Sequence, residues 1–511
     1  MRTWRIQLKN RPCQVHTFAS MMTGSSNNMP FESLNISFTA VMPEILLTGL
    51  ALVVLVTDFF ISQQHKVVLG YLSVSGLVIL LPAAVMSVDP VPSFGGTVTA
   101  DAFSAFFKAI FIIAGILTLS VSTDYLKKSS IHRGEYYYLV LFAILGMMVL
   151  ASANDLLNFY VGLELMALSF YILVALGARR TLSVEGALKY FILGALSSGI
   201  LLYGISCAYG FGGTTNLVEI ARQAVQTPER NPFLLLAIVL IMAGFAFKVA
   251  LFPFHLWAPD AYQGAPVPIT ALLSVGSKAA AFAVFLRIFL VALPAFQLQW
   301  SELLWLLSVG TMIFGSVVAI SQKSIIRMMA YSSIAHAGII VIGLLVRNRT
   351  GIAGILYYLM VYTFMNIGVF TVITMVLKRD RSGEDLYEYK GLAARHPALA
   401  FLMALYLLAL AGVPPTGGFT AKFFILAAAV DAGYYWLAVI GVIATAIALF
   451  FYAKVIYYMY MKEPERIFMD SPPGPASRMV LGVTAAGTVI PGVYPAPFVE
   501  MAQKAIEPFL M

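Results

Sequence analysis

Long apolar stretches separated by short polar segments run through almost the whole chain. The stretches are about 18 to 25 residues long, and a helix of about 20 residues crosses a hydrocarbon core of roughly 30 Å. A transmembrane barrel would instead show alternating segments of about ten residues. The pattern therefore predicts an all-α polytopic membrane protein with about fourteen spans. Their approximate centres are Val53, Val78, Ile112, Ala143, Ala167, Gly199, Val239, Ala280, Phe314, Val341, Phe364, Tyr406 (continuing to Ala428), Ile447 and Thr484.

Two of these stretches contain prolines close to a lysine. Pro253 has no amide N–H and clashes with the preceding turn, so its helix should open just after Lys248. The Pro414-Pro415 pair precedes Lys422, so the second break should come before the lysine. Broken helices at matching places in two halves are typical of transport sites near the membrane midplane. The alternative is that these prolines only kink helices for packing.

Composition and charge placement agree with a membrane protein. The 511 residues are 60% hydrophobic and 11% charged, unlike an ordinary soluble domain. The net charge of +8 could suggest an anionic partner such as nucleic acid, but the basic residues gather in alternate loops. Because lysine and arginine accumulate on the cytoplasmic side, both termini are predicted to lie on the outer face. The richer set of loops holds His65, Lys66, Lys127, Lys128, Arg133, Arg179, Arg180, Lys323, Arg327, Lys378, Arg379, Arg381, Lys390, Arg395, Lys462, Arg466 and Arg478, and the opposite set holds chiefly Arg222, Arg230, Arg347, Arg349 and Lys504.

The first thirty residues depart from this charge pattern. They carry Arg2, Arg5, Lys9 and Arg11 but no apolar segment directly behind them, so they make a poor signal peptide. The absence of acids leaves an organellar transit peptide open. A mis-called start, with translation beginning at Met21, Met22 or Met29, is the favoured interpretation. We expect residues 1–30 to be a disordered or dispensable extension of a single membrane domain spanning residues 31–511.

Motifs for redox cofactors and metals are missing from the sequence. Cys13 and Cys207 are the only cysteines, which excludes a Cys₄ iron–sulfur cluster within this chain, and the six histidines do not cluster as zinc or haem ligands. Gly210, Gly212 and Gly213 follow an apolar helix rather than a strand, so a loop is favoured over a dinucleotide site. Any redox cofactor is therefore expected in partner subunits.

Four ionisable side chains stand in the middle of apolar runs: Glu164, Lys248, Lys278 and Lys422. A charge at bilayer depth costs several kcal/mol unless it is paired or hydrated, so such residues usually mark ion or proton routes. Burial disfavours the charged form of Lys248 and a nearby carboxylate such as Glu164 favours it, which makes a pair that can be switched. Lys278 lies among small residues that leave room for water or close helix approach. The alternative for each is a side chain paired for packing.

Other candidates are weaker. His336 lies among hydroxyl residues and histidine titrates near neutral pH, so it could extend the relay or could simply be a packing residue. Lys189 and Lys454 could belong to the route or reach the membrane interface with their long side chains. For Asp155, Glu185, Lys108 and Glu44, which lie nearer the helix ends, a structural role is favoured.

At these residues the chain resembles the antiporter-like membrane subunits of respiratory complex I, from about Pro43 to about Ala485. The resemblance rests on three pieces: Leu163-Glu164-Leu165, the Lys248 to Pro268 stretch, and Pro414-Pro415 through Lys422. Within the second piece the matching residues include His255, Trp257, Pro259, Asp260 and Tyr262.

The resemblance implies a fold and a route. It implies fourteen helices, with two inverted five-helix repeats over roughly residues 133–292 and 302–461. It also implies that Glu164 and Lys248 form a coupled pair, that Lys278 is a central relay and that Lys422 is the outlet. The implied NADH, FMN, iron–sulfur clusters and quinone belong to partner subunits.

The resulting hypothesis is a proton-translocating subunit of NADH:quinone oxidoreductase in a bacterial inner membrane. Quinone reduction elsewhere in the complex would change the charge or hydration of Glu164 and move protons along the lysines. A subunit of a multicomponent sodium/proton antiporter is the nearest alternative. A structural scaffold, whose charges only pack, is an alternative of another class.

Overall fold

The computed structural model describes residues 36–128, 133–177, 181–226, 231–377, 384–464 and 474–509. The basic extension at residues 1–30, predicted to be disordered or dispensable, lies outside the described residues. Several basic loop residues used for the topology prediction, including Arg179, Arg180 and Arg466, lie outside them as well.

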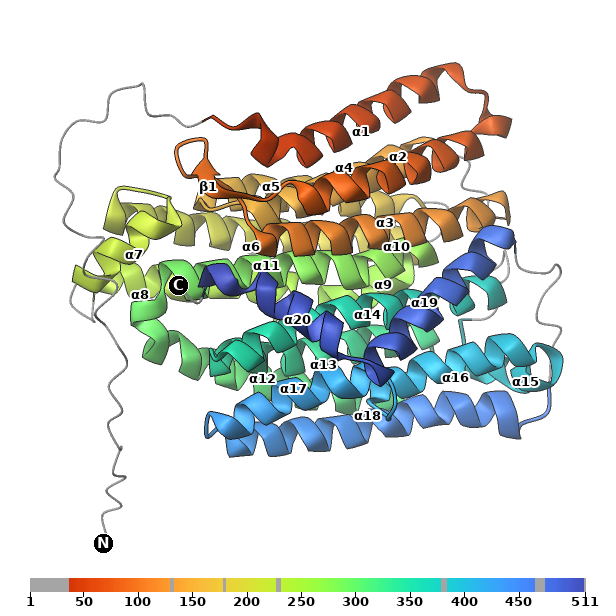
Figure 1. Cartoon of the computed structure of the whole chain (residues 1–511). Coiled ribbons are helices and arrows are strands. Elements are labelled where there is room, and N and C mark those ends of the chain that lie inside the picture. Colours follow the sequence, from red (N-terminus) through yellow and green to blue (C-terminus); the bar gives the residue numbers. More distant parts are fainter. Residues whose placement is uncertain are drawn as a thin grey trace, which may run out of the picture.

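The described chain is a bundle of long helices with one small hairpin (Figure 1). The first part contains α1 (Met42–Phe60), α2 (Val67–Met86), β1 (Asp89–Ser93), β2 (Val98–Ala100), α3 (Ala102–Lys128), α4 (Glu135–Ser152), α5 (Leu156–Ala175), α6 (Thr181–Gly212), α7 (Leu217–Gln226), α8 (Pro232–Lys248) and α9 (Trp257–Gly264). It is followed by α10 (Val267–Leu272), η6 (Leu273–Ser277), α11 (Lys278–Arg287), η7 (Ile288–Ala292), α12 (Gln297–Ser321), α13 (Ile325–Val346) and α14 (Arg349–Val376). The last part contains α15 (Leu392–Arg395), α16 (Pro397–Ala411), α17 (Gly417–Asp431), α18 (Tyr435–Met461), α19 (Pro475–Val493) and α20 (Ala496–Ala505).

The helix content confirms an all-helical membrane fold. Within the described ranges, 12 helical segments are long and apolar enough to cross a membrane. The shorter apolar helices α8 and α16 each continue, after a break, into a second short helix, α9 and α17 respectively. The predicted fourteen spans require counting each broken pair as one span. That count and the two repeats stay predictions.

The centre of the bundle is formed by α13, α14 and the continuous α10–η7 segment. Most of their residues are buried on every side, whereas α1, α2, α18 and α19 expose much of their surface. Figure 1 shows α1 at one edge and α18 at the opposite edge, with α13 and α14 between them. A helix that is apolar all round is stable in such a central place. The central helices carry Lys278 and His336.

Small residues allow the central helices to approach closely. At Gly315 on α12, an added Cβ would lie 2.6 Å from the backbone nitrogen of Ala335 on α13. No side chain fits at that separation, so this contact requires glycine. Close approach at small residues is the usual packing mode of helices in membranes, where apolar surface alone gives little drive for association.

Both described chain ends lie at the same end of the bundle, together with the β1–β2 hairpin and α7, while α15 lies at the other (Figure 1). Ser37 donates a hydrogen bond to Asp89 in the hairpin, and the ring of Phe509 packs 4.7 Å from that of Phe103. This agrees with termini on one side of the membrane.

The hairpin and the amphipathic helix α7 were not expected from the sequence. Gly210 and Gly212, predicted to lie in a loop, belong to the last turns of α6.

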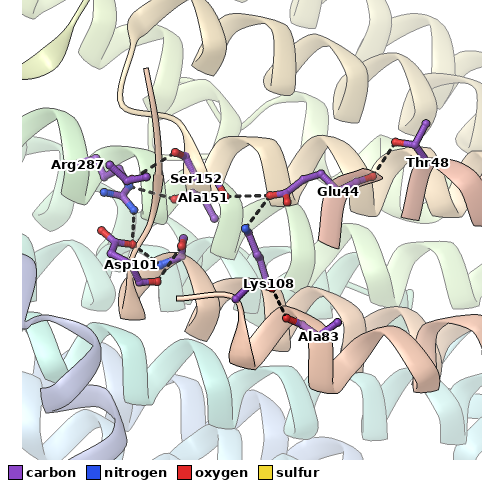
Figure 2. A network of polar contacts seen from close by, with 11 residues as sticks. Glu44, Thr48, Ala83, Asp101, Lys108, Ala151, Ser152 and Arg287 are labelled. Carbon is purple, nitrogen blue, oxygen red and sulfur yellow. Dashed lines mark hydrogen bonds and ion pairs between the residues drawn. The ribbon is translucent and has the colours of Figure 1, made fainter. Parts of the chain in front are cut away.

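A buried polar network joins four helices at this end (Figure 2). Arg287, at the end of α11, pairs with Asp101 at 2.8 Å and donates to the carbonyl of Ala151 at 3.1 Å. Asp101 also accepts from the backbone nitrogen of Ser104 and so caps the start of α3. The guanidinium lies 4.8 Å from the ring centroid of Phe103. These contacts tie α3, α4 and α11 together.

A second pair in the same network involves Glu44 and Lys108, which were expected to be structural. Lys108 Nζ lies 2.8 Å from Glu44 Oε1, and the hydroxyl of Ser152 donates to the same oxygen at 2.9 Å. The pair links the first turn of α1 to α3 and to the end of α4 (Figure 2). The ion pair thus holds the start of α1 against α3, which supports a structural role, while Glu44 Oε2 has no hydrogen-bond partner among the described residues.

We predict that Asp101→Asn lowers the stability of the protein. Burial raises the pKa of the Asp101 carboxyl, but the Arg287 charge and the Ser104 hydrogen bonds outweigh it and hold the pKa below its ordinary value of 3.8. The substitution leaves buried Arg287 without its charge partner, which typically costs about 3–5 kcal/mol. The apparent melting temperature in detergent should fall at neutral pH.

The exposed pair between Arg222 and Glu219 provides the control. Glu219→Gln should change stability by about 1 kcal/mol or less. Because a carboxyl with a lowered folded-state pKa stabilises only when ionised, the Asp101→Asn deficit should shrink as the pH falls through the lowered pKa. Equal melting temperatures for the two variants at neutral pH would contradict the assignment.

Candidate functional site

The first broken helix ends at Lys248, as the proline predicts. Val249 caps α8, Ala250 takes a positive φ of 59°, and α9 begins at Trp257. Two hydrogen bonds satisfy backbone groups at the break, one from a distant helix and one across the break itself. The amide of Phe252 donates to Thr311 Oγ1 at 2.9 Å, and the indole of Trp257 donates to the carbonyl of Phe247 at 2.8 Å. These bonds make an opened helix tolerable inside a membrane protein.

The second broken helix supplies the hydrogen-bond acceptors for Lys422. The α16 helix ends at Ala411, Gly412 follows with a φ of 86°, and α17 begins at Gly417. Lys422 Nζ, on α17, donates to the carbonyls of Leu410 at 2.8 Å and Ala411 at 3.1 Å. Carbonyls in the last turn of a helix have no partner within the helix. The break therefore exposes the groups that hold the buried lysine.

Glu164 and Lys248 lie close enough to interact electrostatically. Lys248 is buried at 5% exposure, and among the described residues neither its Nζ nor Glu164 Oε1 has a hydrogen-bond partner. The buried hydroxyl of Tyr171, beside Glu164, has none within the same part of the chain. The two charges are thus neighbours without a direct bond. The polar atoms around them also include some without a hydrogen-bond partner among the described residues.

Lys278 begins α11 immediately after the π-helical turn η6. Its ammonium donates to Ser333 on α13, to the carbonyl oxygen and at 2.6 Å to the hydroxyl. Its Nζ also lies 5.8 Å from the ring centroid of Tyr362. Single π-helical turns are frequently found at functional sites. Here the turn precedes a lysine that is buried at 3% exposure and, within the described ranges, donates to Ser333 rather than to a carboxylate.

His336, on α13, has two charged neighbours. It is within electrostatic range of both Lys278 and Lys422. Its Nδ1 is 2.6 Å from the hydroxyl of Tyr358, and its Nε2 is 3.2 Å from the hydroxyl of Tyr452. Both ring nitrogens are therefore engaged. The structure brings together Lys278, His336 and Lys422 around the centre of the bundle.

Lys189 belongs to a different charged cluster. Its Nζ lies 2.7 Å from Glu185 and 2.8 Å from Asp260, and Arg327 lies 2.6 Å from the other oxygen of Asp260. The cluster joins α6, α9 and α13. Lys189 is 44% exposed, so it is more accessible than the four central residues. Lys454 on α18 takes part in none of these contacts among the described residues.

Sequence reasoning missed two uncharged members of the site, Tyr358 and Tyr452, and noted Ser333 only as one of the hydroxyl residues around His336. Tyrosines are common in membrane helices and give no local signal. The contacts of these three residues join positions 22 to 116 residues apart along the chain. Asp260 was noted only as part of a motif. Its position directly after Pro259, close behind the break at Pro253, was the available hint.

Comparisons with known proteins give one consistent picture. The family model described as "NADH:quinone oxidoreductase/Mrp antiporter, TM" matches residues 153–448. The NADH-quinone oxidoreductase subunit N of Trichlorobacter lovleyi is 43% identical over 93% of this chain and 98% of its own length.

Solved structures agree with the sequence relatives. A chain of respiratory complex I from Thermus thermophilus with bound aureothin superposes with a TM-score of 0.77 and 31% identity, covering 90% of this chain and 99% of that one. A chain of the Mrp complex from Dietzia sp. gives a TM-score of 0.80 at 22% identity, covering 92% and 97%, and shares the fold.

We predict that Gly412→Ala displaces Lys422 from its carbonyl partners. A Cβ at Gly412 would lie 3.1 Å from Lys422 Cδ, and the positive φ adds backbone strain. The displaced ammonium should react faster with an amine-labelling reagent, measured residue by residue by mass spectrometry. Gly433→Ala is a matched control, because Gly433 has a φ of 82° and nothing within 4 Å of the added Cβ. Both variants carry about 1 kcal/mol of strain, but only Gly412→Ala should change Lys422 labelling.

Proposed function

Since this chain belongs to the NADH:quinone oxidoreductase/Mrp antiporter family and, within it, to the subunit N proteins of NADH-quinone oxidoreductase, we propose that it translocates protons across a membrane. Redox energy released by quinone reduction elsewhere in the complex drives the transport. The chain acts as part of a translocase and carries the proton route rather than the redox chemistry.

The observation that carries this proposal is the set of buried basic groups joined by neutral hydrogen-bond partners. Lys278 donates to Ser333, Lys422 donates to two backbone carbonyls, and His336 binds two tyrosine hydroxyls. A carbonyl or hydroxyl can accept from a charged or a neutral amine. A carboxylate in contact would instead favour the charged amine strongly. These groups can therefore change protonation without breaking their surroundings.

Glu164 and Lys248 form the input of the route in this proposal. A change in the charge or hydration of Glu164 alters how strongly the ammonium of Lys248 is held, because the two interact electrostatically without a direct bond. A proton released from Lys248 moves toward Lys278, then to His336 and Lys422. Lys422 lies at the second helix break and acts as the outlet. Lys189 contributes a positive charge near α9, at the edge of this route.

We place NADH, FMN, iron–sulfur clusters and quinone in partner subunits. The chain has two cysteines, too few for a Cys₄ cluster. Neighbouring antiporter-like subunits and the peripheral redox subunits are the expected partners, and the exposed apolar faces of α1, α2 and α18 contact lipid or those subunits. The location we propose is the bacterial inner membrane, with both termini on the outer face.

The antiporter alternative has one observation in its favour, which is the shared fold of the Mrp chain. A sodium-dependent pH gradient formed by the purified complex without NADH would favour it. Co-purification of flavin and iron–sulfur subunits with this chain would favour the proposed function.

We predict that Lys248→Ala and Glu164→Ala each reduce proton uptake driven by NADH oxidation in sealed vesicles. Removing a positioned proton carrier typically slows the transfer step by about a hundredfold or more, so pumping should fall by at least about tenfold. The complex should still assemble, because Lys248 Nζ and Glu164 Oε1 make no hydrogen bond to the described residues that the substitutions would break.

Lys504→Ala, at an exposed position on α20, serves as the control and should pump normally. Full proton stoichiometry in both test variants would remove Glu164 and Lys248 from the mechanism. Failure of every charge variant to assemble would favour the scaffold alternative instead.

A further inference from the structure

The hydroxyl of Tyr452 connects two polar side chains of α13 at the centre of the bundle. It makes a very short hydrogen bond with Ser332 Oγ and lies 3.2 Å from His336 Nε2. Ser332 and His336 are four residues apart, so they project from one face of the helix. All three side chains are buried, with exposures of 3% or less. Tyr452 comes from α18, which begins more than eighty residues after α13 ends.

The ring of Tyr362 lies near both Lys278 and His336. Lys278 Nζ lies 5.8 Å from the centroid of that ring, and the imidazole of His336 lies 5.3 Å from it. The Tyr362 hydroxyl is buried and interacts with the side chain of Ser333. The hydrogen bonds that reach His336 come from Tyr452 and Tyr358, so a hydrogen-bonded path between the two bases runs through those groups.

Hydrogen-bonded groups are present along one such path. Lys278 donates to Ser333 Oγ at 2.6 Å, and Ser332 is the next residue on α13. Adjacent residues of a helix point in different directions, so this path requires a bridging water between the two serine hydroxyls. Ser332 then contacts Tyr452, and Tyr452 contacts His336. Beyond the imidazole, Nδ1 lies 2.6 Å from the hydroxyl of Tyr358 on α14.

The two nitrogens of the imidazole allow one to take up a proton while the other releases one. When the ammonium of Lys278 gives a proton toward Ser333, the hydroxyl protons of Ser333, Ser332 and Tyr452 each move one group along, and Nε2 of His336 takes the last one. Each bond that breaks is replaced by one that forms: the hydroxyls stay neutral, Lys278 becomes a neutral amine and His336 an imidazolium whose Nδ1–H donates to Tyr358. A histidine that loses a proton at one nitrogen as it gains one at the other does not have to leave its site.

We propose that Tyr452 is a proton-carrying residue between Lys278 and His336, flanked by Ser332 and Tyr358. This inference rests on the proposed proton-translocating function and deepens it, because it names the uncharged groups that join the bases. A purely structural hydroxyl, which only fastens α18 to α13, is the competing explanation. The two explanations differ in whether the acidity of the phenol affects transport.

The first test removes single hydroxyls in the assembled complex. Tyr452→Phe should slow NADH-driven proton uptake in sealed vesicles by on the order of tenfold, the effect of losing one hydrogen bond in the transfer step. Ser332→Ala should slow it in the same direction. Tyr406→Phe is the matched control, because Tyr406 is also fully buried and its hydroxyl binds Leu481 and Thr484 away from the basic groups. It should pump normally.

The second test keeps the hydroxyl and changes its acidity. Incorporation of 3-fluorotyrosine at position 452 preserves the shape and the hydrogen bonds but makes the phenol a stronger acid. The rate of proton uptake should change there and should not change with 3-fluorotyrosine at position 406. This variant also decides the matter if Tyr452→Phe fails to assemble.

The outcomes separate this inference from the proposed function. If Lys278→Met stops proton uptake while both Tyr452 variants pump like the wild type, the hydroxyl path is wrong and the lysine route stands. If Lys278→Met also pumps normally, the proposed function is wrong and the inference falls with it. Equal losses in the Tyr452 and Tyr406 variants would assign both hydroxyls to packing.

Discussion

The cost of placing a charged group in a low-dielectric interior is the constraint on which this structure depends. A buried ammonium needs acceptors, and membrane helices use almost all of theirs internally. The chain meets this need by breaking a helix. The end of α16 at Ala411 frees two carbonyls that hold Lys422, and Lys278 uses a backbone carbonyl and a hydroxyl of Ser333 on α13. The helix break and the buried lysine are therefore two parts of one solution.

The chemical nature of each partner separates two kinds of buried lysine. Lys108 lies 2.8 Å from the carboxylate of Glu44, and this ion pair fastens α1 to α3. Lys278 and Lys422 contact neutral oxygens, which accept from an amine in either protonation state. Lys248 is intermediate, since it senses Glu164 electrostatically without a bond. The same residue type thus serves architecture in one place and suits transport in another.

The charged groups are carried by helices at different places in the bundle. The central helices α13 and α14 supply His336 and Tyr358, while α11 and α17 bring Lys278 and Lys422 within electrostatic range of the histidine. Glu164 and Lys248 lie on α5 and α8, earlier in the chain. Charges in neighbouring places along the membrane plane can influence one another in turn because the interior screens them weakly. Such packing supports the lateral relay that we propose.

The amino-acid sequence alone determined the membrane class, the two helix breaks and the identities of the buried charged residues. These features are local: apolar runs set helix length, and the missing N–H of Pro253 opens α8 at Lys248 wherever the helix packs. Tertiary structure alone decided which group each charge meets. Three contacts join residues from separate helices: the ion pair of Glu44 with Lys108, the hydrogen bond from Lys422 to the carbonyl of Leu410, and the contact of Tyr452 with His336. Such contacts depend on how whole helices pack, and close packing is a collective property that no short segment of the chain encodes.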